Sequence, residues 1–193
     1  MLWVVTGAIG SGKSDFAVEL ALSAGSEGIR LSCPPFPFPN STDHSRAAKE
    51  RDGKFLWTSS EADESLAHKL HAINMESNIF RAERRVIVVD SLSGWLRLMY
   101  NPKADRGTDM EKWVDARWRE TLEAICSFEG KIIIVTEEPS AGLDMPPIER
   151  DFVYRLAAAN RKLMASGATF YRMTAGMATE VKGYRLKRRD DEI

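Results

Sequence analysis

The residues best suited to do chemistry form a glycine-rich octapeptide close to the N-terminus. It fits the pattern G-x-x-x-x-G-K-[ST] at every fixed position and reads Gly7, Ala8, Ile9, Gly10, Ser11, Gly12, Lys13 and Ser14. Glycines let such a loop turn tightly, so that successive N–H groups form a nest for anionic oxygens. The Lys13 ammonium can neutralise β and γ phosphates, and the Ser14 hydroxyl can ligate Mg²⁺. The octapeptide therefore predicts a P-loop that binds the phosphates of a purine nucleoside triphosphate.

The segments on either side of the octapeptide agree with this interpretation. Residues 2–5 form an apolar run rich in β-branched side chains, which indicates a buried strand. Residues 13–23 have the spacing of an amphipathic helix. A helix that begins at Lys13 directs its N-terminal partial positive charge at the bound phosphates. The order of strand, loop and helix is the context that phosphate binding requires.

Acidic residues follow two further apolar runs, residues 86–89 and residues 131–135. The carboxyl ends of strands in an open α/β sheet face the ligand crevice, so Asp90 is a candidate for ordering the magnesium hydration shell. Alternatively, Asp90 caps the helix that follows, and one carboxylate could serve both roles. Either Glu137 or Glu138 could act as a base or bind a ribose. A solvated loop pair is the other interpretation of these two glutamates.

The rest of the chain alternates between short apolar runs and amphipathic stretches. The patterns predict strands at 29–31 and 169–173 and helices at 59–71, 110–128 and 151–165. Four prolines between residues 34 and 39 remove backbone donors and exclude regular structure there. This order predicts an α/β fold of the P-loop NTPase type, with a mainly parallel sheet and helices on both faces. We expect one domain over residues 1–193, with a polar tail from about residue 183.

Composition and charge argue against several classes of partner. The 27 Lys and Arg residues nearly balance 28 Asp and Glu, and a net charge of -1 gives no reason to expect nucleic acid or an anionic membrane. The first apolar run is too short for a signal peptide, and no stretch approaches the length of a membrane span. Cys33 and Cys126 show no metal-ligand spacing and fit reduced thiols. We therefore expect a cytoplasmic protein.

Several motifs in series resemble the adenosylcobinamide kinase/adenosylcobinamide-phosphate guanylyltransferases of cobalamin biosynthesis. That family opens with a strand and G-G-x-R-S-G-K-S, and its W-x-T-x-E signature is similar to residues 57–61. It also has an acidic residue at the end of the middle strand, like Asp90. Its V-T-N-E-V-G and V-N-Q segments are similar to residues 135–140 and 159–161. The order and approximate spacing hold from residue 1 to about residue 176.

The resemblance implies a kinase that transfers a phosphoryl group from ATP or GTP to a corrinoid hydroxyl, with Mg²⁺ as cofactor. It also implies a homo-oligomer, such as a trimer. Joined to the arguments above, it gives a candidate set: Lys13, Asp90 and Glu138 for catalysis, Ser14 and Asp90 for the metal, and Glu61 and Asn160 for substrate.

One departure from the family bears on its second activity. In the family, a histidine upstream of the tryptophan accepts the guanylyl group as a phosphoramidate. The matching position here is Lys49 or Glu50, and neither replaces imidazole as a nucleophile that also leaves readily. His44 lies five or six residues too early. We therefore expect kinase chemistry without guanylyl transfer. The alternatives are a P-loop kinase or NTPase with another acceptor, or a non-catalytic nucleotide-binding regulatory protein.

Overall fold

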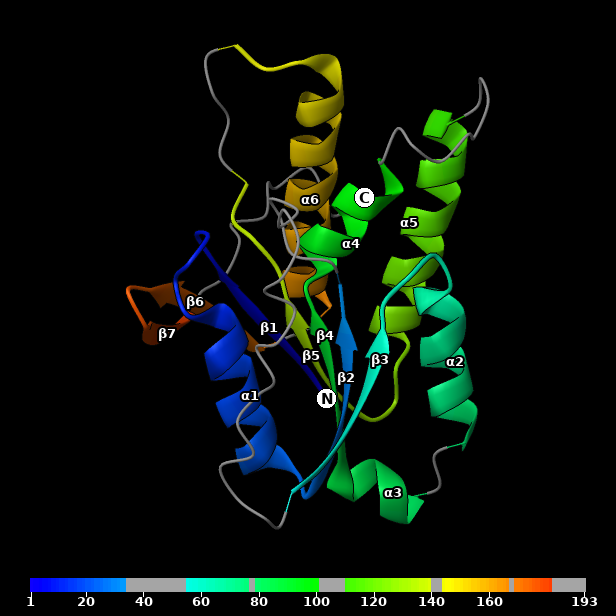
Figure 1. The fold of residues 1–193 in the computed structure, drawn as a ribbon, viewed down its shortest axis with the longest axis vertical. Coiled ribbons are helices and arrows are strands. Elements are labelled where there is room, and N and C mark those ends of the chain that lie inside the picture. The colour runs from blue at the N-terminus through cyan, green and yellow to red at the C-terminus, as the bar shows by residue number, and fades with distance from the viewer. Residues whose placement is uncertain (34–54, 77–78, 101–109, 140–143, 167–168, 182–193) are drawn as a thin grey trace, which may run out of the picture.

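The computed structural model describes residues 1–33, 55–76, 79–100, 110–139, 144–166 and 169–181. The strands in these segments are β1 (Leu2–Gly7), β2 (Glu27–Ser32), β3 (Leu56–Glu61), β4 (Arg85–Asp90), β5 (Lys131–Val135), β6 (Thr169–Thr174) and β7 (Met177–Val181). The helices are α1 (Lys13–Ala24), α2 (Leu66–Glu76), α3 (Ile79–Arg84), α4 (Leu92–Met99), α5 (Met110–Cys126) and α6 (Pro147–Ala165), and Figure 1 shows their arrangement.

The strands form one sheet in the order β3-β2-β4-β5-β1-β6-β7. Neighbouring strands are parallel, except that β6 and β7 form an antiparallel hairpin. The carboxyl ends of β1 to β6 therefore gather at one edge of the sheet, which is the upper edge in Figure 1. This order confirms the predicted α/β class with a mainly parallel sheet.

Helices cover both faces of the sheet, as expected. Helix α1 packs on one face, where Ala17 and Ala21 join Val88 and Ile133 in a buried cluster. Helices α2, α4, α5 and α6 lie on the other face and bury a larger cluster (Figure 1). Strands β4 and β5 are covered on both faces, which accounts for their unbroken apolar sequences. None of the described helices is long and apolar enough to cross a membrane.

The predicted helix over residues 59–71 is wrong in its first half. Residues 59–61 belong to β3, which pairs with β2 along its whole length, from Leu56 opposite Glu27 to Glu61 opposite Ser32. Helix α2 begins only at Leu66, after a turn at Glu64 and Ser65. The hydroxyl and acidic residues suggested a helix start, but strand pairing overrides this local preference.

Helix α3 and strand β7 have no counterpart among the sequence predictions. All five residues of β7 are exposed, so this strand lacks the apolar alternation on which strand prediction depends. A tight turn sets its pairing instead, with Ala175 (φ 50°) and Gly176 (φ 84°) in left-handed conformation. This hairpin matters because its turn lies against the glycine-rich loop.

Candidate functional site

The glycine-rich loop joins the end of β1 to the start of α1 at the carboxyl edge of the sheet. Ser11 N donates to Ala8 O (3.2 Å) within the loop, and α1 begins with Phe16 N bonded to Gly12 O (3.0 Å). Gly12 is the N-cap of α1 and carries no side-chain cap. The first N–H groups of the helix therefore point out of its amino end and are suited to anionic oxygens.

Backbone contacts from neighbouring strands hold this loop in shape. Gly7 has a φ of 150°, and a Cβ at this position would lie 2.6 Å from Met173 O on β6. Gly176 N, in the turn of the hairpin, donates to Ser11 O (3.1 Å). Glu138 N, just past β5, approaches Gly7 O at 3.4 Å. The loop is therefore braced on both sides of β1.

Lys13 directs its ammonium back into the loop. Its Nζ donates to Gly7 O (3.1 Å) and Ala8 O (2.6 Å), and the residue is only 8% exposed. Burial lowers the pKa of the Lys13 ammonium, while the negative charges of Glu137, Asp90 and Glu138 act in the opposite direction. Phosphate oxygens entering the loop could replace the two carbonyls, and their negative charge would stabilise the ammonium that burial destabilises.

Asp90 lies directly beside the loop, and both of its carboxylate oxygens accept hydrogen bonds. Ser14 Oγ donates to Oδ1 (3.0 Å), and Arg30 Nη2 on β2 contacts Oδ2 at 2.6 Å. The next helix is capped by Ser91, whose Oγ accepts from Gly94 N (3.0 Å). The structure thus assigns the capping role to the neighbouring serine and turns Asp90 towards Ser14.

The hydroxyl of Ser14 and the carboxylate of Asp90 are oxygen donors of the kind that a magnesium ion prefers. Mg²⁺ prefers oxygen ligands and is usually held by one or two protein groups together with substrate phosphates and water. When the Ser14 hydroxyl donates a hydrogen bond to Asp90, the lone pairs of Ser14 Oγ remain available for a cation. Ser14 and Asp90 are therefore the residues that would hold a magnesium ion beside the glycine-rich loop, and this metal role stays a prediction.

The chain after β5 brings two glutamates to the same edge. Glu138 Oε2 pairs with Arg172 Nη2 on β6 (2.8 Å), and both side chains are partly exposed. Asn160 on α6 accepts from Thr136 Oγ1 (3.1 Å) and donates through Nδ2 to Glu137 O (3.0 Å). The amide of Asn160 thus holds the end of β5, and a substrate contact by this residue remains a prediction.

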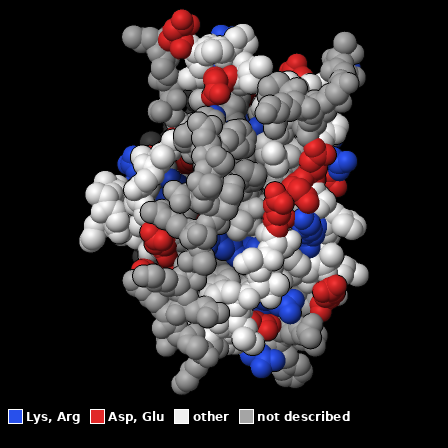
Figure 2. Space-filling model, in the orientation of Figure 1, with Lys and Arg blue, Asp and Glu red and all other residues white. Residues whose placement is uncertain are grey.

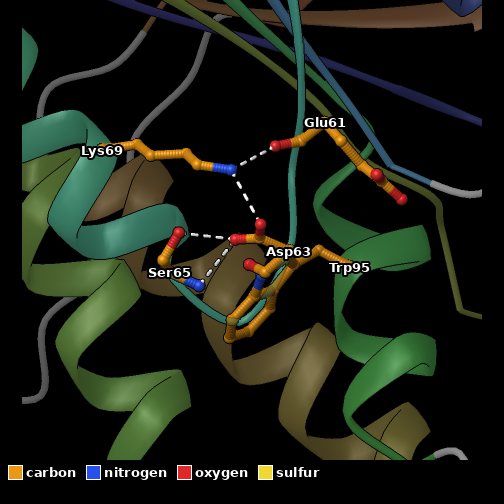
Figure 3. Close-up of polar contacts among 5 residues, drawn as sticks. All are labelled: Glu61, Asp63, Ser65, Lys69 and Trp95. Carbon is orange, nitrogen blue, oxygen red and sulfur yellow. Dashed lines mark hydrogen bonds and ion pairs between the residues drawn. The ribbon is translucent and has the colours of Figure 1, made fainter.

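Glu61 ends β3 on the outer side of the same edge. Lys69 Nζ donates to Glu61 O (2.7 Å) and to Asp63 Oδ2 (2.9 Å), while Ser65 and Trp95 also bond to Asp63. Figure 3 shows that the Glu61 carboxylate points away from this cluster. Acidic side chains gather over this turn in Figure 2, where the sequence has Glu61, Asp63 and Glu64. The polar cluster fixes the backbone and leaves the Glu61 side chain exposed.

Comparison with known proteins places the chain. The family described as "Cobinamide kinase / cobinamide phosphate guanyltransferase" matches residues 3–181, a range that includes the glycine-rich loop, Asp90 and both glutamates. The chain belongs to this family. Its members are nucleotide-dependent transferases of cobalamin biosynthesis. The resemblance read from the motifs is thereby confirmed.

Other comparisons add little to this family assignment. No curated protein matches the sequence. Among solved structures, the crystal structure of the RadB recombinase superposes with a TM-score of 0.43 at 14% identity, over 89% of this chain and 73% of that chain. The fold is defined by the order and direction of this chain's own strands.

The position of the family's guanylyl-accepting histidine lies outside the described residues. Lys49, Glu50 and His44 all fall between residues 34 and 54, as does the proline-rich stretch. The C-terminal tail from residue 183 is also outside the described part. His68 and His71 are exposed on α2.

The sequence patterns do not predict two arginines that lie at this edge. Arg30 contacts Asp90, and Arg172 contacts Glu138. Arg30 could have been noticed in the sequence, because this charged residue interrupts an apolar strand between Ile29 and Leu31. For Arg172 no such signal exists, since a polar residue is ordinary on a strand with one exposed face.

Proposed function

We propose that this chain is a kinase that transfers the γ-phosphoryl group of ATP or GTP to a hydroxyl group of a corrinoid, with Mg²⁺ as cofactor. The observation that carries the proposal is the hydrogen bond between Ser14 and Asp90, formed beside a P-loop whose lysine is directed into the loop. Family membership supports the corrinoid acceptor.

In the transfer, the acceptor oxygen forms a bond to the γ phosphorus while the bond from that phosphorus to the β,γ-bridging oxygen breaks. The nucleoside diphosphate leaves, and the hydroxyl proton passes to a carboxylate. Loop N–H groups and the amino end of α1 bind the phosphates, and Lys13 offsets charge on the β and γ groups. Bound Mg²⁺, held by Ser14 and Asp90, supplies further charge neutralisation.

Glu138 is our candidate for the group that takes the proton. Arg172 holds Oε2, and the other carboxylate oxygen remains to accept a hydrogen bond from the acceptor hydroxyl. Glu61 is our candidate for an acceptor contact, because its carboxylate projects from the carboxyl edge away from its supporting cluster (Figure 3). Phosphoryl transfer depends mainly on positioning and charge, so these groups suffice for the kinase step.

We propose that guanylyl transfer, the second activity of the family, is lost. The step requires a nucleophile that forms a P–N bond and later releases the nucleotide, which imidazole does near neutral pH because its pKa lies close to 6.5. A lysine amine at position 49 is protonated unless strongly desolvated. A glutamate at position 50 forms a labile mixed anhydride instead.

A transfer assay with γ-labelled ATP or GTP and a corrinoid acceptor tests the kinase. We expect labelled corrinoid phosphate from the wild type, and a loss of turnover of at least about 100-fold in Asp90→Asn, as for other groups that stabilise charge at the transition state. Glu27→Gln serves as the matched control, because Glu27 pairs with an arginine at the opposite end of the same strands. Its turnover should stay within about twofold of wild type, as is usual away from special sites. Tight nucleotide binding without any transfer would overturn the proposal.

Incubation with α-labelled GTP and Mg²⁺ tests the loss of guanylyl transfer. We expect no acid-labile, base-stable guanylyl adduct on the protein. An adduct that disappears in His44→Ala would show that His44 replaces the family histidine, and the protein would then be assigned both activities.

A further inference from the structure

Arg30 occupies an unusual place in the middle of the sheet. Strand β2 lies between β3 and β4, and Ser32 at its carboxyl end is paired with Glu61 on one side and Asp90 on the other. Arg30 precedes Ser32 by two residues and so lies on the same face, which is the face that α1 covers. Its side chain reaches diagonally to Asp90.

This ion pair is largely withdrawn from water. The side chains of Arg30 and Asp90 are 19% and 12% exposed, and Nη2 lies 2.6 Å from Oδ2. Arg30 Nε is buried and has no hydrogen-bond partner among the described residues. Removing a guanidinium from water is costly, and a buried ion pair often contributes little net stability. What the pair does to Asp90 is therefore of more interest than its contribution to folding.

The two contacts on Asp90 come from different elements and fix the carboxylate. Arg30 Nη2 holds Oδ2 from β2, while Ser14 Oγ donates to Oδ1 from α1. A guanidinium can only donate, so Arg30 holds Oδ2 as its acceptor while Oδ1 faces Ser14. Without Arg30, the Asp90 side chain could rotate and satisfy its oxygens elsewhere.

We propose that Arg30 is a positioning residue for metal–nucleotide binding. It holds Asp90 so that the Ser14 hydroxyl donates a hydrogen bond to Oδ1 and keeps its lone pairs for Mg²⁺. This inference rests on the proposed P-loop site for Mg²⁺ and nucleotide. Arg30 has two opposing effects on the affinity for Mg²⁺. Its hold on Asp90 favours metal binding, whereas its positive charge repels the cation. The sign of the change on removing Arg30 decides which effect dominates.

The chain contains a matched pair for comparison. Arg85 Nε lies 3.3 Å from Glu27 Oε1, and this pair also joins β2 to β4. The Arg85 side chain is 15% exposed, close to the value for Arg30. The pair lies at the amino end of both strands, away from the glycine-rich loop. Arg85→Met therefore removes a similar cross-strand ion pair without touching the proposed site.

The test is thermal stabilisation by ADP, measured as a function of Mg²⁺ concentration, which needs no turnover. In Arg30→Met, we expect the Mg²⁺ concentration for half-maximal stabilisation to rise about tenfold, as is common when a residue supporting a metal ligand is removed. ADP affinity without metal should stay within about twofold. Arg30→Lys, which keeps the charge but loses the fork of donors, should give an intermediate rise.

Arg85→Met should leave the Mg²⁺ dependence unchanged. An unchanged or lowered Mg²⁺ requirement in Arg30→Met would overturn the proposal and leave Arg30 as an ordinary ion-pair partner or a repelling charge. If Arg30→Met does not fold, a Mg²⁺ requirement of Arg30→Lys equal to that of wild type would overturn it. A wild-type protein whose ADP binding ignores Mg²⁺ would instead refute the proposed metal–nucleotide site itself.

Discussion

The carboxyl edge of the sheet has two halves that are built in different ways. Around β1, contacts between backbone groups hold the glycine-rich loop in place. Gly176 N donates to Ser11 O, and Gly7 lies so close to β6 that a side chain has no room. Around β3, side chains hold the backbone in place. Those of Lys69, Ser65 and Trp95 donate hydrogen bonds to Asp63 or to the end of the strand (Figure 3).

The difference follows from what each half is proposed to bind. Triphosphates present the same anionic oxygens in every nucleotide, so a loop of backbone N–H groups suffices and requires a fixed shape. An acceptor has its own shape and polar groups, so recognising it requires particular side chains. In the half around β3, other side chains hold such residues in place. The comparison predicts large effects from backbone changes near β1 and small, pH-dependent effects near β3.

The largest effect is expected from Gly7→Ala. The new Cβ would lie 2.6 Å from Met173 O, a backbone atom that cannot swing aside, and φ at this position is 150°. The loop must shift, which should cost about 1–3 kcal/mol of folding stability. Loss of two or more charge-assisted contacts should weaken ATP and GTP binding by about 100-fold or more. Calorimetric titration and chemical unfolding measure both quantities.

Gly10→Ala is the control for that change. A Cβ there has nothing within 4 Å, although φ is 73°. The strain of a left-handed alanine should cost about 1 kcal/mol, with nucleotide affinity reduced much less than in Gly7→Ala. Equal losses in the two variants would show that backbone conformation, and not the contact with β6, sets the effect.

The next effect is expected from Lys13→Ala. Loss of one charge-assisted contact to the phosphates should weaken triphosphate binding by roughly 1.5–3 kcal/mol, with folding nearly intact. Isothermal titration with ATP and GTP provides the measurement. Unchanged affinity for both nucleotides would refute a P-loop function for this segment.

Proton uptake on nucleotide binding gives a second test of the role of Lys13. Burial lowers the pKa of Lys13 in the free protein, and phosphate oxygens raise it in the complex. At alkaline pH below the ordinary lysine pKa of about 10.4, binding should therefore take up protons. Titrations in two buffers of different ionisation enthalpy detect this uptake. Lys13→Ala should abolish it.

The two halves also differ in how far the sequence predicts them. The sequence predicts the loop with its flanking strand and helix, because a fixed spacing of glycines, lysine and serine reflects one backbone geometry. It also predicts the acidic residue that ends β4, because that residue follows a continuous apolar run. The structure brings Ser14 and Asp90 within hydrogen-bonding distance, and their role in binding a metal stays a prediction.

The outer half could not be predicted in the same way. Its residues are close only because β3 pairs with β2 and then turns into α2, and the hydroxyl and acidic residues of β3 suggested a helix instead. Arg30 acts across strands, so its partner is 60 residues away in sequence. Contacts of this kind depend on sheet order, which one sequence does not encode in any local pattern.

The smallest effect is expected from Asp63→Asn. The hydroxyl of Ser65, together with Lys69 and the Ser65 N–H, lowers the pKa of the Asp63 carboxyl to about 2. Asparagine can still accept from the Ser65 N–H, so the change removes mainly the charge. The Asp63 side chain is 50% exposed, and solvent screening limits the loss of folding stability at pH 7 to about 1 kcal/mol or less.

The pH dependence follows from the sign of that shift. The carboxyl has a folded-state pKa of about 2, below its ordinary value of about 3.9, so its contribution is present above pH 4 and disappears as the pH falls through 2. Urea unfolding of wild type and Asp63→Asn should differ at pH 7 and converge near pH 2. Glu120→Gln, which disrupts an exposed pair with Arg117, should change stability by less. Nucleotide affinity should not change in Asp63→Asn, because backbone contacts hold the half around β1 independently of Asp63. A loss of affinity in this variant would contradict the separation of the two halves.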